Sequence, residues 1–372
     1  LTMDTLSFKK CYMHGMINDS QGRKMSKSQG NYIVPEEVYE KYGADTFRFY
    51  AIGGANPGLD LNYNMDDVKI KYKNLAILWN IQNFVIDIAK NNNINPSKIK
   101  ITNKDLKREE KYILSKLHST IKLVTDKFED MLLNEVPLRI EDLFIDLSRT
   151  YIQLARDKAA IGSKKEKEVV TYTIYTVLLE SLKLFATICP FITEKIYQNL
   201  KAEFKLKEES IHLFKWPSFD ETAIDTKLEQ DFDIASKIIQ ATLSAREKAQ
   251  ISNRWPLASI HIATSNKDTQ TSITRSKEII MSQTNIKNII VKESFPEAKT
   301  TIKADFKQIG PDFGKLAPKI VAALAKESPE AIINHLEKDK KFTINIDGKD
   351  INIVKEHLIM QREVPDKIIE GD

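Results

Sequence analysis

The feature that most constrains this chain is a long central region, residues 64–217, in which apolar residues recur at helical spacing. Asn64 is a suitable N-cap, and Asp66 and Asp67 follow it in the first turn, where carboxylates are favoured. The apolar stripe of this first helix falls at Val68, Tyr72, Leu75, Trp79 and Ile86. Further helices are predicted at about 106–133, 136–158, 165–187 and 191–201. Such long helices with short connections favour an antiparallel helical bundle over alternating α/β units.

The residues before the bundle alternate short elements with turns. A strand is predicted at 8–17, a turn at 18–22, a glycine-bounded polar loop at 23–31, two short helices at 35–43 and 44–52, and an extended segment at 55–63. This part contains no complete sheet of its own.

The residues after the bundle have a different pattern. An extended segment at 210–217 precedes a long connecting helix, predicted at roughly 222–250. Residues 257–263 alternate as a strand does, and Asp347-Gly348 is typical of a type I′ hairpin turn. The remaining elements are expected as helices near 274–283, 314–325 and 329–337 and strands near 287–292, 341–346 and 349–354. We therefore predict a small α+β domain at 257–372.

The composition excludes some classes of protein but does not indicate a particular function. The net charge of +4 is weakly basic and neither requires nor excludes nucleic acid. The two cysteines, Cys11 and Cys189, are far apart and form no C-x-x-C pair, so a disulfide framework and a structural zinc site are not expected. Free thiols fit a reducing cytoplasm, and no apolar run is long enough to predict a membrane span. Because no initiator methionine precedes Leu1, the chain is expected to be a fragment that starts inside a domain.

The stretch most informative about chemistry is Lys24-Met25-Ser26-Lys27-Ser28. Two lysines separated by two residues in a glycine-flanked loop can both reach one polyphosphate, and lysine is a flexible point charge. Ser26 and Ser28 add hydroxyl donors. Such a loop can stabilise the charge that develops on a leaving pyrophosphate. The residue types alone leave equally open that this is a solvated basic loop with no ligand.

The context of the loop resembles the signature loop of the class I aminoacyl-tRNA synthetases. The matching residues are His14-Gly15-Met16, Asp19 and Gly22-Arg23 before it, and Gln29-Gly30-Asn31, Pro35 and Tyr42-Gly43-Ala44-Asp45-Thr46-Phe47-Arg48 after it. The resemblance implies that residues 1–63 are the end of a Rossmann-type catalytic domain with its stem-contact region. It also implies that Lys24, Met25, Ser26, Lys27 and Ser28 bind ATP, supplied as its Mg²⁺ complex. Lys24 and Lys27 would be the catalytic residues, and no resident metal is expected.

Several downstream segments resemble the isoleucyl branch of this family, in its archaeal and eukaryotic form. They are residues 60–64, 75–80, 148–157, 210–217, 246–249, 254–257 and, more weakly, 310–315. Thr150 stands where the family pattern has an aromatic residue. The alternatives are a valyl or leucyl enzyme of the same family, or a non-catalytic tRNA-binding protein derived from one.

The isoleucyl resemblance implies activation of isoleucine by ATP and its transfer to tRNA(Ile), with residues 64–217 as an anticodon-binding domain, 218–256 as a connecting helix and 257–372 as a C-terminal domain. Neither DNA nor a membrane is an expected partner. Candidate tRNA contacts are Arg149, Arg156 and Lys158, which lie at helical spacing and could equally form a solvated face, and Arg246 and Arg254, which rest on resemblance. The opening catalytic motif and the editing domain of such enzymes are missing, so the chain alone is expected to be inactive.

Overall fold

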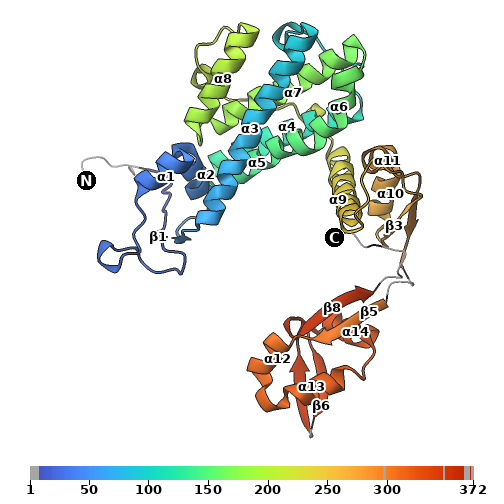
Figure 1. The fold of residues 1–372 in the computed structure, drawn as a ribbon. Helices are drawn as coiled ribbons and strands as arrows, with labels where there is room; N and C mark the ends of the chain where they lie inside the picture. Colours follow the sequence, from blue (N-terminus) through green and yellow to red (C-terminus); the bar gives the residue numbers. More distant parts are fainter. Residues whose placement is uncertain (1–7, 296–298, 347, 364–368, 370–372) are drawn as a thin grey trace. The chain divides into compact units, whose positions relative to one another are not determined.

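The computed structural model describes residues 8–295, 299–346, 348–363 and 369 (Figure 1). The chain forms two compact units, Leu1–Asp233 and Ile234–Asp372. Helices dominate the first unit, and the second combines helices with short strands, which confirms the predicted mainly α fold.

Short elements open the first unit. Strands β1 (Ile17–Asn18) and β2 (Leu61–Asn62) pair in parallel, with Ile17 opposite Leu61. Helices α1 (Pro35–Tyr42) and α2 (Ala44–Gly53) lie between them in sequence. Their small core joins Val38, Tyr50, Leu61, Tyr63 and Val68, so this part packs onto the start of the first bundle helix.

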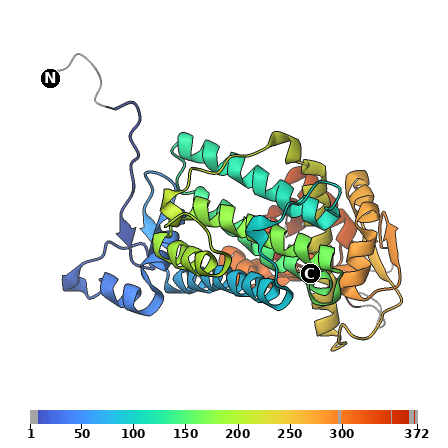
Figure 2. The same ribbon diagram turned by 90° about the horizontal axis from the view of Figure 1, so that it is seen from above.

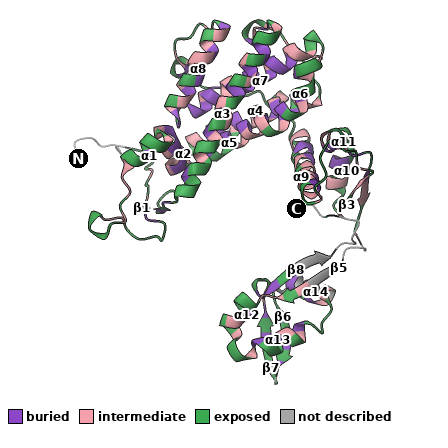
Figure 3. Ribbon diagram, in the orientation of Figure 1, coloured by how far each residue is buried: buried purple, intermediate pink, exposed green. Residues whose placement is uncertain are grey.

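The rest of the first unit is a helical bundle. Its helices are α3 (Met65–Asn92), α4 (Arg108–Glu129), α5 (Val136–Asp146), α6 (Ile152–Ile161), α7 (Lys164–Phe185) and α8 (Pro190–Phe204). Seen from above, the long helices lie side by side (Figure 2), and α7 contacts α3, α4, α6 and α8. Helix α7 is therefore the central helix of the bundle, which agrees with its many buried positions (Figure 3).

Local signals explain where these helices begin. The Asn64 side chain accepts a hydrogen bond from the Asp66 backbone amide, as expected for an N-cap. Ser163 and Glu166 form a reciprocal capping box at the start of α7. Aromatic side chains then link the elements: the Phe185 ring centroid is 5.1 Å from that of Phe49 and 5.9 Å from that of Phe144.

The second unit contains two separate groups of elements with their own apolar cores. In the first, α9 (Thr226–Lys248), which begins in the first unit, packs against α10 (Lys267–Arg275), α11 (Lys277–Thr284) and the parallel strands β3 (Ile260–Ala263) and β4 (Ile289–Lys292). In the second, the helices are α12 (Phe306–Phe313), α13 (Ala317–Leu324) and α14 (Pro329–Asp339). Its antiparallel pairs are β5 (Lys299–Ala304) with β8 (Leu358–Glu363) and β6 (Phe342–Ile346) with β7 (Lys349–Ile353).

Several sequence-based expectations differ from this structure. The strand expected at 8–17 is wrong in extent, since only Ile17 and Asn18 join a ladder. The backbone opposite this segment turns at Asn56–Leu59 and does not continue as a strand. Its bonds to the segment are isolated ones, from the Gly58 amide to the Met13 carbonyl and from the Leu61 amide to the Met16 carbonyl. The helix expected at 136–158 is α5, a π-helical turn at Leu147–Tyr151 and α6 in succession.

Differences in the second unit concern boundaries and non-local pairs. The helix expected at 274–283 is replaced by α10 and α11, and the connecting helix α9 is shorter than predicted. The pair β5–β8 and helix α12 were not predicted. Asp347 of the expected hairpin turn lies outside the described residues, while Gly348 has the positive φ of 78° that such a turn needs. The two compact units divide inside α9, and the four-part domain division remains a prediction.

Candidate functional site

The lysine–serine loop, residues 23–31, connects the β1 region to α1. It begins where Lys24 pairs with Asn18 in an isolated antiparallel bridge. A single 3₁₀ turn then spans Lys27–Gln29. Gly30 ends the turn with a φ of 68°, a left-handed conformation that glycine adopts without strain. The loop therefore has a defined path at both ends.

The Asp19 carboxylate organises the start of the loop. It accepts hydrogen bonds from the backbone amides of Gln21 (3.0 Å) and Arg23 (2.8 Å), from Arg23 Nε (2.8 Å) and from Asn31 Nδ2 (3.0 Å). These donors favour the charged form, with Asn31 having the largest effect, and hold the pKa of Asp19 well below its usual range. Asp19 thus stays ionised and ties the two ends of the loop together.

Asn31 fixes the middle of the loop. Its amide nitrogen also donates to the Lys24 carbonyl (3.1 Å), and its amide oxygen accepts from the Ser26 backbone amide (2.9 Å). The half-buried Met25 side chain packs against the core formed around Val38 and Tyr50. The backbone on both sides of Met25 is therefore held from within the protein.

The two lysines extend from this fixed backbone into solvent. Lys24 and Lys27 are exposed, and neither ammonium group forms an ion pair within the described residues. Lys27 Nζ is 5.6 Å from the centroid of the Tyr32 ring, and Ser26 Oγ lies 2.7 Å from Ser28 Oγ. Two unpaired cations and two hydroxyls on one held loop can bind a polyphosphate by charge and hydrogen bonding.

Two backbone segments, at Gly15 and at Leu59, approach each other closely just before the loop. A Cβ atom on Gly15 would lie 2.1 Å from the Leu59 carbonyl oxygen, so only glycine allows these segments to meet. The Asp60 carboxylate accepts from the Met16 backbone amide (2.8 Å) and from Asn18 Nδ2 (3.1 Å). Asp60 thus positions the segment before the loop. The sequence placed Asp60 only within a segment that resembles the family, because its hydrogen-bond partners Met16 and Asn18 are distant in sequence.

The predicted tRNA contacts on the bundle do not share one environment. Arg149 and Arg156 are both exposed, and Arg149 lies in the π-helical turn between α5 and α6. Such turns occur frequently at functional sites. These two arginines remain available to contact phosphates.

Lys158 differs from the predicted role. Its ammonium group contacts the Glu109 carboxylate and lies 2.9 Å from Glu110 Oε1. Glu110 is fully buried, and it also accepts from the Tyr151 hydroxyl (3.2 Å) and the Lys107 backbone amide (2.9 Å). Because Lys158 balances this buried charge, the structure gives it a structural role in place of a phosphate contact.

Arg246 also has a structural role. It is 3% exposed, and its guanidinium donates to the carbonyls of Thr284 (3.1 Å), Ser252 (3.2 Å) and Asn285 (3.1 Å). Because the guanidinium is buried and bonded to three backbone carbonyls, the structure favours a structural role over the predicted direct tRNA contact for Arg246. Arg254, the fifth predicted contact, is exposed on the loop that follows α9.

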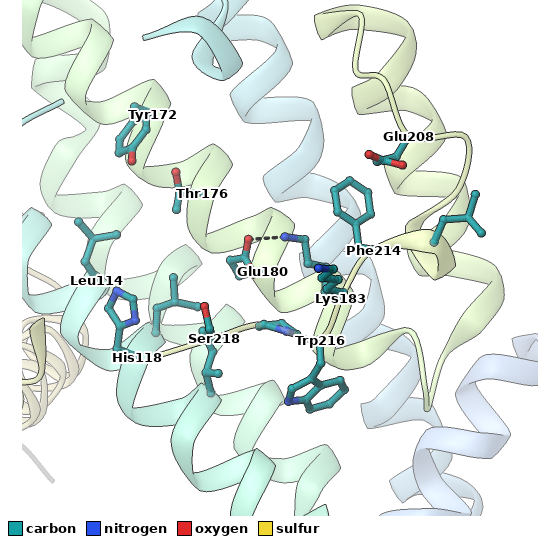
Figure 4. A pocket seen from close by; sticks show the side chains of 15 residues that line it. Leu114, His118, Tyr172, Thr176, Glu180, Lys183, Glu208, Phe214, Trp216 and Ser218 are labelled. Atoms are coloured by element: carbon teal, nitrogen blue, oxygen red, sulfur yellow. Dashed lines mark hydrogen bonds and ion pairs between the residues drawn. The ribbon is translucent and has the colours of Figure 1, made fainter. Parts of the chain in front are cut away.

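A surface groove of about 710 Å³ lies between α4, α7 and the crossing segment 208–218 (Figure 4). Its polar side chains are largely engaged within the protein. Lys183 pairs with Glu180 (2.6 Å) and stacks over Phe214, and Trp216 Nε1 donates to Thr125 Oγ1 (2.9 Å). The groove therefore anchors the crossing segment, although Lys215, which also lines it, is exposed and has no ion pair within the described residues.

The described residues contain no group of three or more His, Cys, Asp or Glu side chains placed to hold a metal ion. Cys11 is exposed, and the buried Cys189 lies under α2, with its sulfur 3.5 Å from the Asp45 carbonyl oxygen. No helix in this part of the chain is both long and apolar enough to cross a membrane.

Two families of domains match the chain. Residues 2–64 match the tRNA synthetases class I (I, L, M and V), and residues 110–262 match the anticodon-binding domain of tRNA ligase. The first match contains the lysine–serine loop, and the second contains most of the bundle.

Individual relatives match over nearly the whole chain. The isoleucine–tRNA ligase of Thermococcus kodakarensis is 35% identical over 368 residues, which are 98% of this chain and 34% of the relative. The isoleucine–tRNA ligase of Pyrococcus horikoshii is 33% identical over 374 residues, covering 100% and 34%, and that of Methanothermobacter thermautotrophicus is 32% identical over 372 residues, covering 99% and 36%. The chain thus spans about a third of the length of these curated relatives.

Proposed function

We propose that this chain, which matches domains of class I tRNA synthetases and of tRNA ligases, supplies the ATP-phosphate loop and the tRNA-binding part of an isoleucine–tRNA ligase. The observation that carries this proposal is the alignment of isoleucine–tRNA ligases from several archaea over 98% or more of the chain. A second support is the lysine–serine loop, in which two exposed lysines are presented on a backbone held by Asp19 and Asn31.

The proposed reaction has two steps. Isoleucine attacks the α-phosphate of ATP, which enters as its Mg²⁺ complex, and gives isoleucyl-adenylate and pyrophosphate. The aminoacyl group then moves to the terminal ribose of tRNA(Ile), and AMP leaves. Neither step needs a covalent enzyme intermediate, so catalysis consists of positioning and of charge stabilisation.

In the first step Lys24 and Lys27 would act on the departing pyrophosphate. Negative charge grows on the leaving group as the bond to the α-phosphate breaks, and two ammonium groups stabilise that charge more than they stabilise bound ATP. Ser26 and Ser28 would donate hydrogen bonds to phosphate oxygens. The amino-acid pocket, together with the remainder of the adenine site, belongs to the part of the relatives that this chain does not span.

In the second step the bundle would hold the tRNA. Arg149 and Arg156 are its proposed phosphate contacts, and Arg254 is the proposed contact in the second unit. Anticodon bases are unstacked and can be recognised on their edges, unlike bases in a duplex. The proposed location of the protein is the cytoplasm, where tRNA is charged.

Binding of the purified chain to RNA tests this proposal. A tRNA transcript, an RNA duplex of equal length and a DNA duplex would be compared by filter binding across a salt series. We expect the tRNA to bind most tightly, with an affinity that falls as salt rises because phosphate contacts release counterions. Equal affinity for all three, or no affinity for tRNA, would contradict the proposal.

A further inference from the structure

The loop that follows α9, residues 249–257, carries an unusually exposed aromatic side chain. Trp255 is 70% exposed, whereas Trp216 is 40% exposed and has a hydrogen-bond partner. Within the described residues no aromatic ring or cation stacks on the Trp255 indole. A large apolar side chain left in solvent on an ordered loop is a candidate contact for a partner.

This loop is ordered by the protein around it. Gln250 ends the helix with a φ of 55°, and the Ile251 amide donates back to the Arg246 carbonyl (2.9 Å). The buried Arg246 guanidinium then donates to the Ser252 carbonyl (3.2 Å), and the Trp255 amide donates to the same carbonyl (3.1 Å). Arg246 therefore holds the loop closed onto the end of α9.

A second residue holds the tip of the loop. Asn285 Nδ2 donates to the carbonyls of Asn253 (2.9 Å) and Arg254 (3.2 Å), on the N-terminal side of the tryptophan. Asn253 Nδ2 in turn donates to the Gln283 carbonyl (3.1 Å). On the C-terminal side, the Leu257 amide donates to the Asn285 carbonyl (3.1 Å), so the backbone is fixed on both sides of Trp255 and binding through this residue would cost little ordering entropy.

The charged groups beside the indole favour an anionic partner. Arg254 is exposed, and the exposed Lys287 follows Ile286, which pairs with Leu257 in a parallel bridge. The last turn of α9 contributes one exposed acidic residue, Glu247. An exposed indole on a loop that also carries an exposed arginine suits an unpaired nucleobase, which stacks on the ring while its phosphates meet the positive charge.

We propose that Trp255 stacks on an unpaired base of bound tRNA, and that Arg246 and Asn285 are positioning residues that present it. This proposal rests on the proposed function, because it names the kind of RNA feature that the same protein binds. It also gives the buried Arg246 a role in binding that requires no contact with the RNA.

The test compares Trp255→Ala and Trp255→Phe in the full chain, with an isoleucine tRNA transcript as the probe. Stacking on an aromatic ring contributes roughly 1–3 kcal/mol per base, so we expect Trp255→Ala to weaken binding about 5- to 150-fold and Trp255→Phe to retain most of the affinity. The salt dependence of Trp255→Ala should equal that of the parent, whereas Arg254→Gln should lower the slope by about 1.

Three further measurements separate stacking from a general loss of structure. Phe306→Ala removes another exposed aromatic, 67% exposed beside Lys307, and should leave tRNA binding unchanged. Asn285→Gly keeps the left-handed backbone at that position (φ 49°) but removes the two hydrogen bonds, and should weaken binding in the same direction as Trp255→Ala. Quenching of tryptophan fluorescence by tRNA should be strong in the parent and nearly absent in Trp255→Phe.

The outcomes distinguish this inference from the proposed function. Tight tRNA binding by the parent that is unchanged in Trp255→Ala would overturn the stacking proposal and leave the proposed function intact. Failure of the parent to bind tRNA at all would overturn both.

Discussion

Asp19 and Asn31 are side chains that hold the lysine–serine loop without extending toward a ligand. Asn31 bonds to the Asp19 side chain, the Lys24 carbonyl and the Ser26 amide, so it fixes three points of one short segment. The lysines gain from this arrangement, because a held backbone reduces the entropy lost when their ammonium groups close on a ligand. At the scale of single residues, the candidate site is a hydrogen-bonded loop that presents two exposed cations.

Asn31→Ala should loosen this loop without unfolding the protein. Each lost hydrogen bond contributes about 1 kcal/mol, so we expect the Ser26 amide to exchange with solvent about 5- to 10-fold faster. Gln29→Ala, an exposed neighbour in the same turn, is the matched control and should change nothing. Amide hydrogen exchange followed by NMR measures both, and unchanged protection of Ser26 in Asn31→Ala would show that the loop is held in another way.

The acid stability of the loop follows from Asp19. Hydrogen bonds from Asn31 above all, and then from Arg23 and Gln21, lower the pKa of this carboxyl in the folded protein. A depressed pKa contributes stability that is present above the unfolded value of about 3.9 and is lost as the pH falls through the folded value. The loop should therefore stay ordered from neutral pH down to about pH 4 and loosen only in stronger acid.

An NMR titration of the Asp19 carboxyl carbon checks this expectation. In the parent the carboxyl should titrate well below an ordinary aspartate, and Asn31→Ala should move its midpoint upward, since the largest of the lowering hydrogen bonds is removed. Titration of the parent near pH 4 would contradict the hydrogen-bonded arrangement.

At the scale of elements, the junction of α4 and α6 shows how the bundle uses charge. Glu110 lies in the first turn of α4, and its buried carboxylate is satisfied by Lys107, Tyr151 and Lys158 from three parts of the sequence. The π-helical turn ends at Tyr151 and so aligns its hydroxyl with this carboxylate. Lys158, which the sequence placed on a possible surface stripe, is thus an ion-pair partner of this buried carboxylate.

Lys158→Ala and Arg156→Ala should separate stability from binding. Removing Lys158 leaves the buried Glu110 without its cation, and we expect a loss of about 3 kcal/mol in the free energy of unfolding, measured with urea. Arg156 is exposed on the same helix, so its removal should change stability by less than about 0.5 kcal/mol while weakening tRNA binding. Unchanged stability together with weakened tRNA binding in Lys158→Ala would instead place Lys158 on the tRNA-binding face.

The helices were more predictable than the pairings between distant segments. Helix α3 was predicted from its Asn64 cap and its apolar stripe, which are local signals within one helix. The pair β5–β8 was missed because it joins Thr300 to Arg362, and alternation in one strand says nothing about a distant partner. The exposure of the loop lysines agrees with the sequence-based prediction, whose functional part stays a prediction, whereas the burial of Arg246 could not be predicted, since its carbonyl partners Thr284 and Asn285 are distant in sequence.

At the scale of the whole molecule, we propose that the chain supplies part of a catalytic site and a tRNA-binding part. It spans about a third of its isoleucine–tRNA ligase relatives, 34% of the Thermococcus kodakarensis enzyme. The lysines can stabilise pyrophosphate, but they cannot by themselves position isoleucine against the α-phosphate. The proposed tRNA contacts, in contrast, all lie on this chain.

The isolated chain should therefore fail to activate isoleucine. Isoleucine-dependent exchange between ATP and labelled pyrophosphate should stay at background, because catalysis requires both reactants to be oriented together. The same preparation should bind tRNA, which serves as the control for correct folding. Exchange well above background would mean that this chain contains a complete activation site.

The most direct test of the central claim is whether the chain distinguishes tRNAs by their anticodon. Binding would be measured for isoleucine, valine and leucine tRNA transcripts, and for an isoleucine tRNA whose anticodon is replaced, at several salt concentrations. We predict tightest binding to the isoleucine tRNA and loss of that preference when its anticodon is changed. Equal, strongly salt-dependent binding to every tRNA would contradict anticodon recognition by this chain.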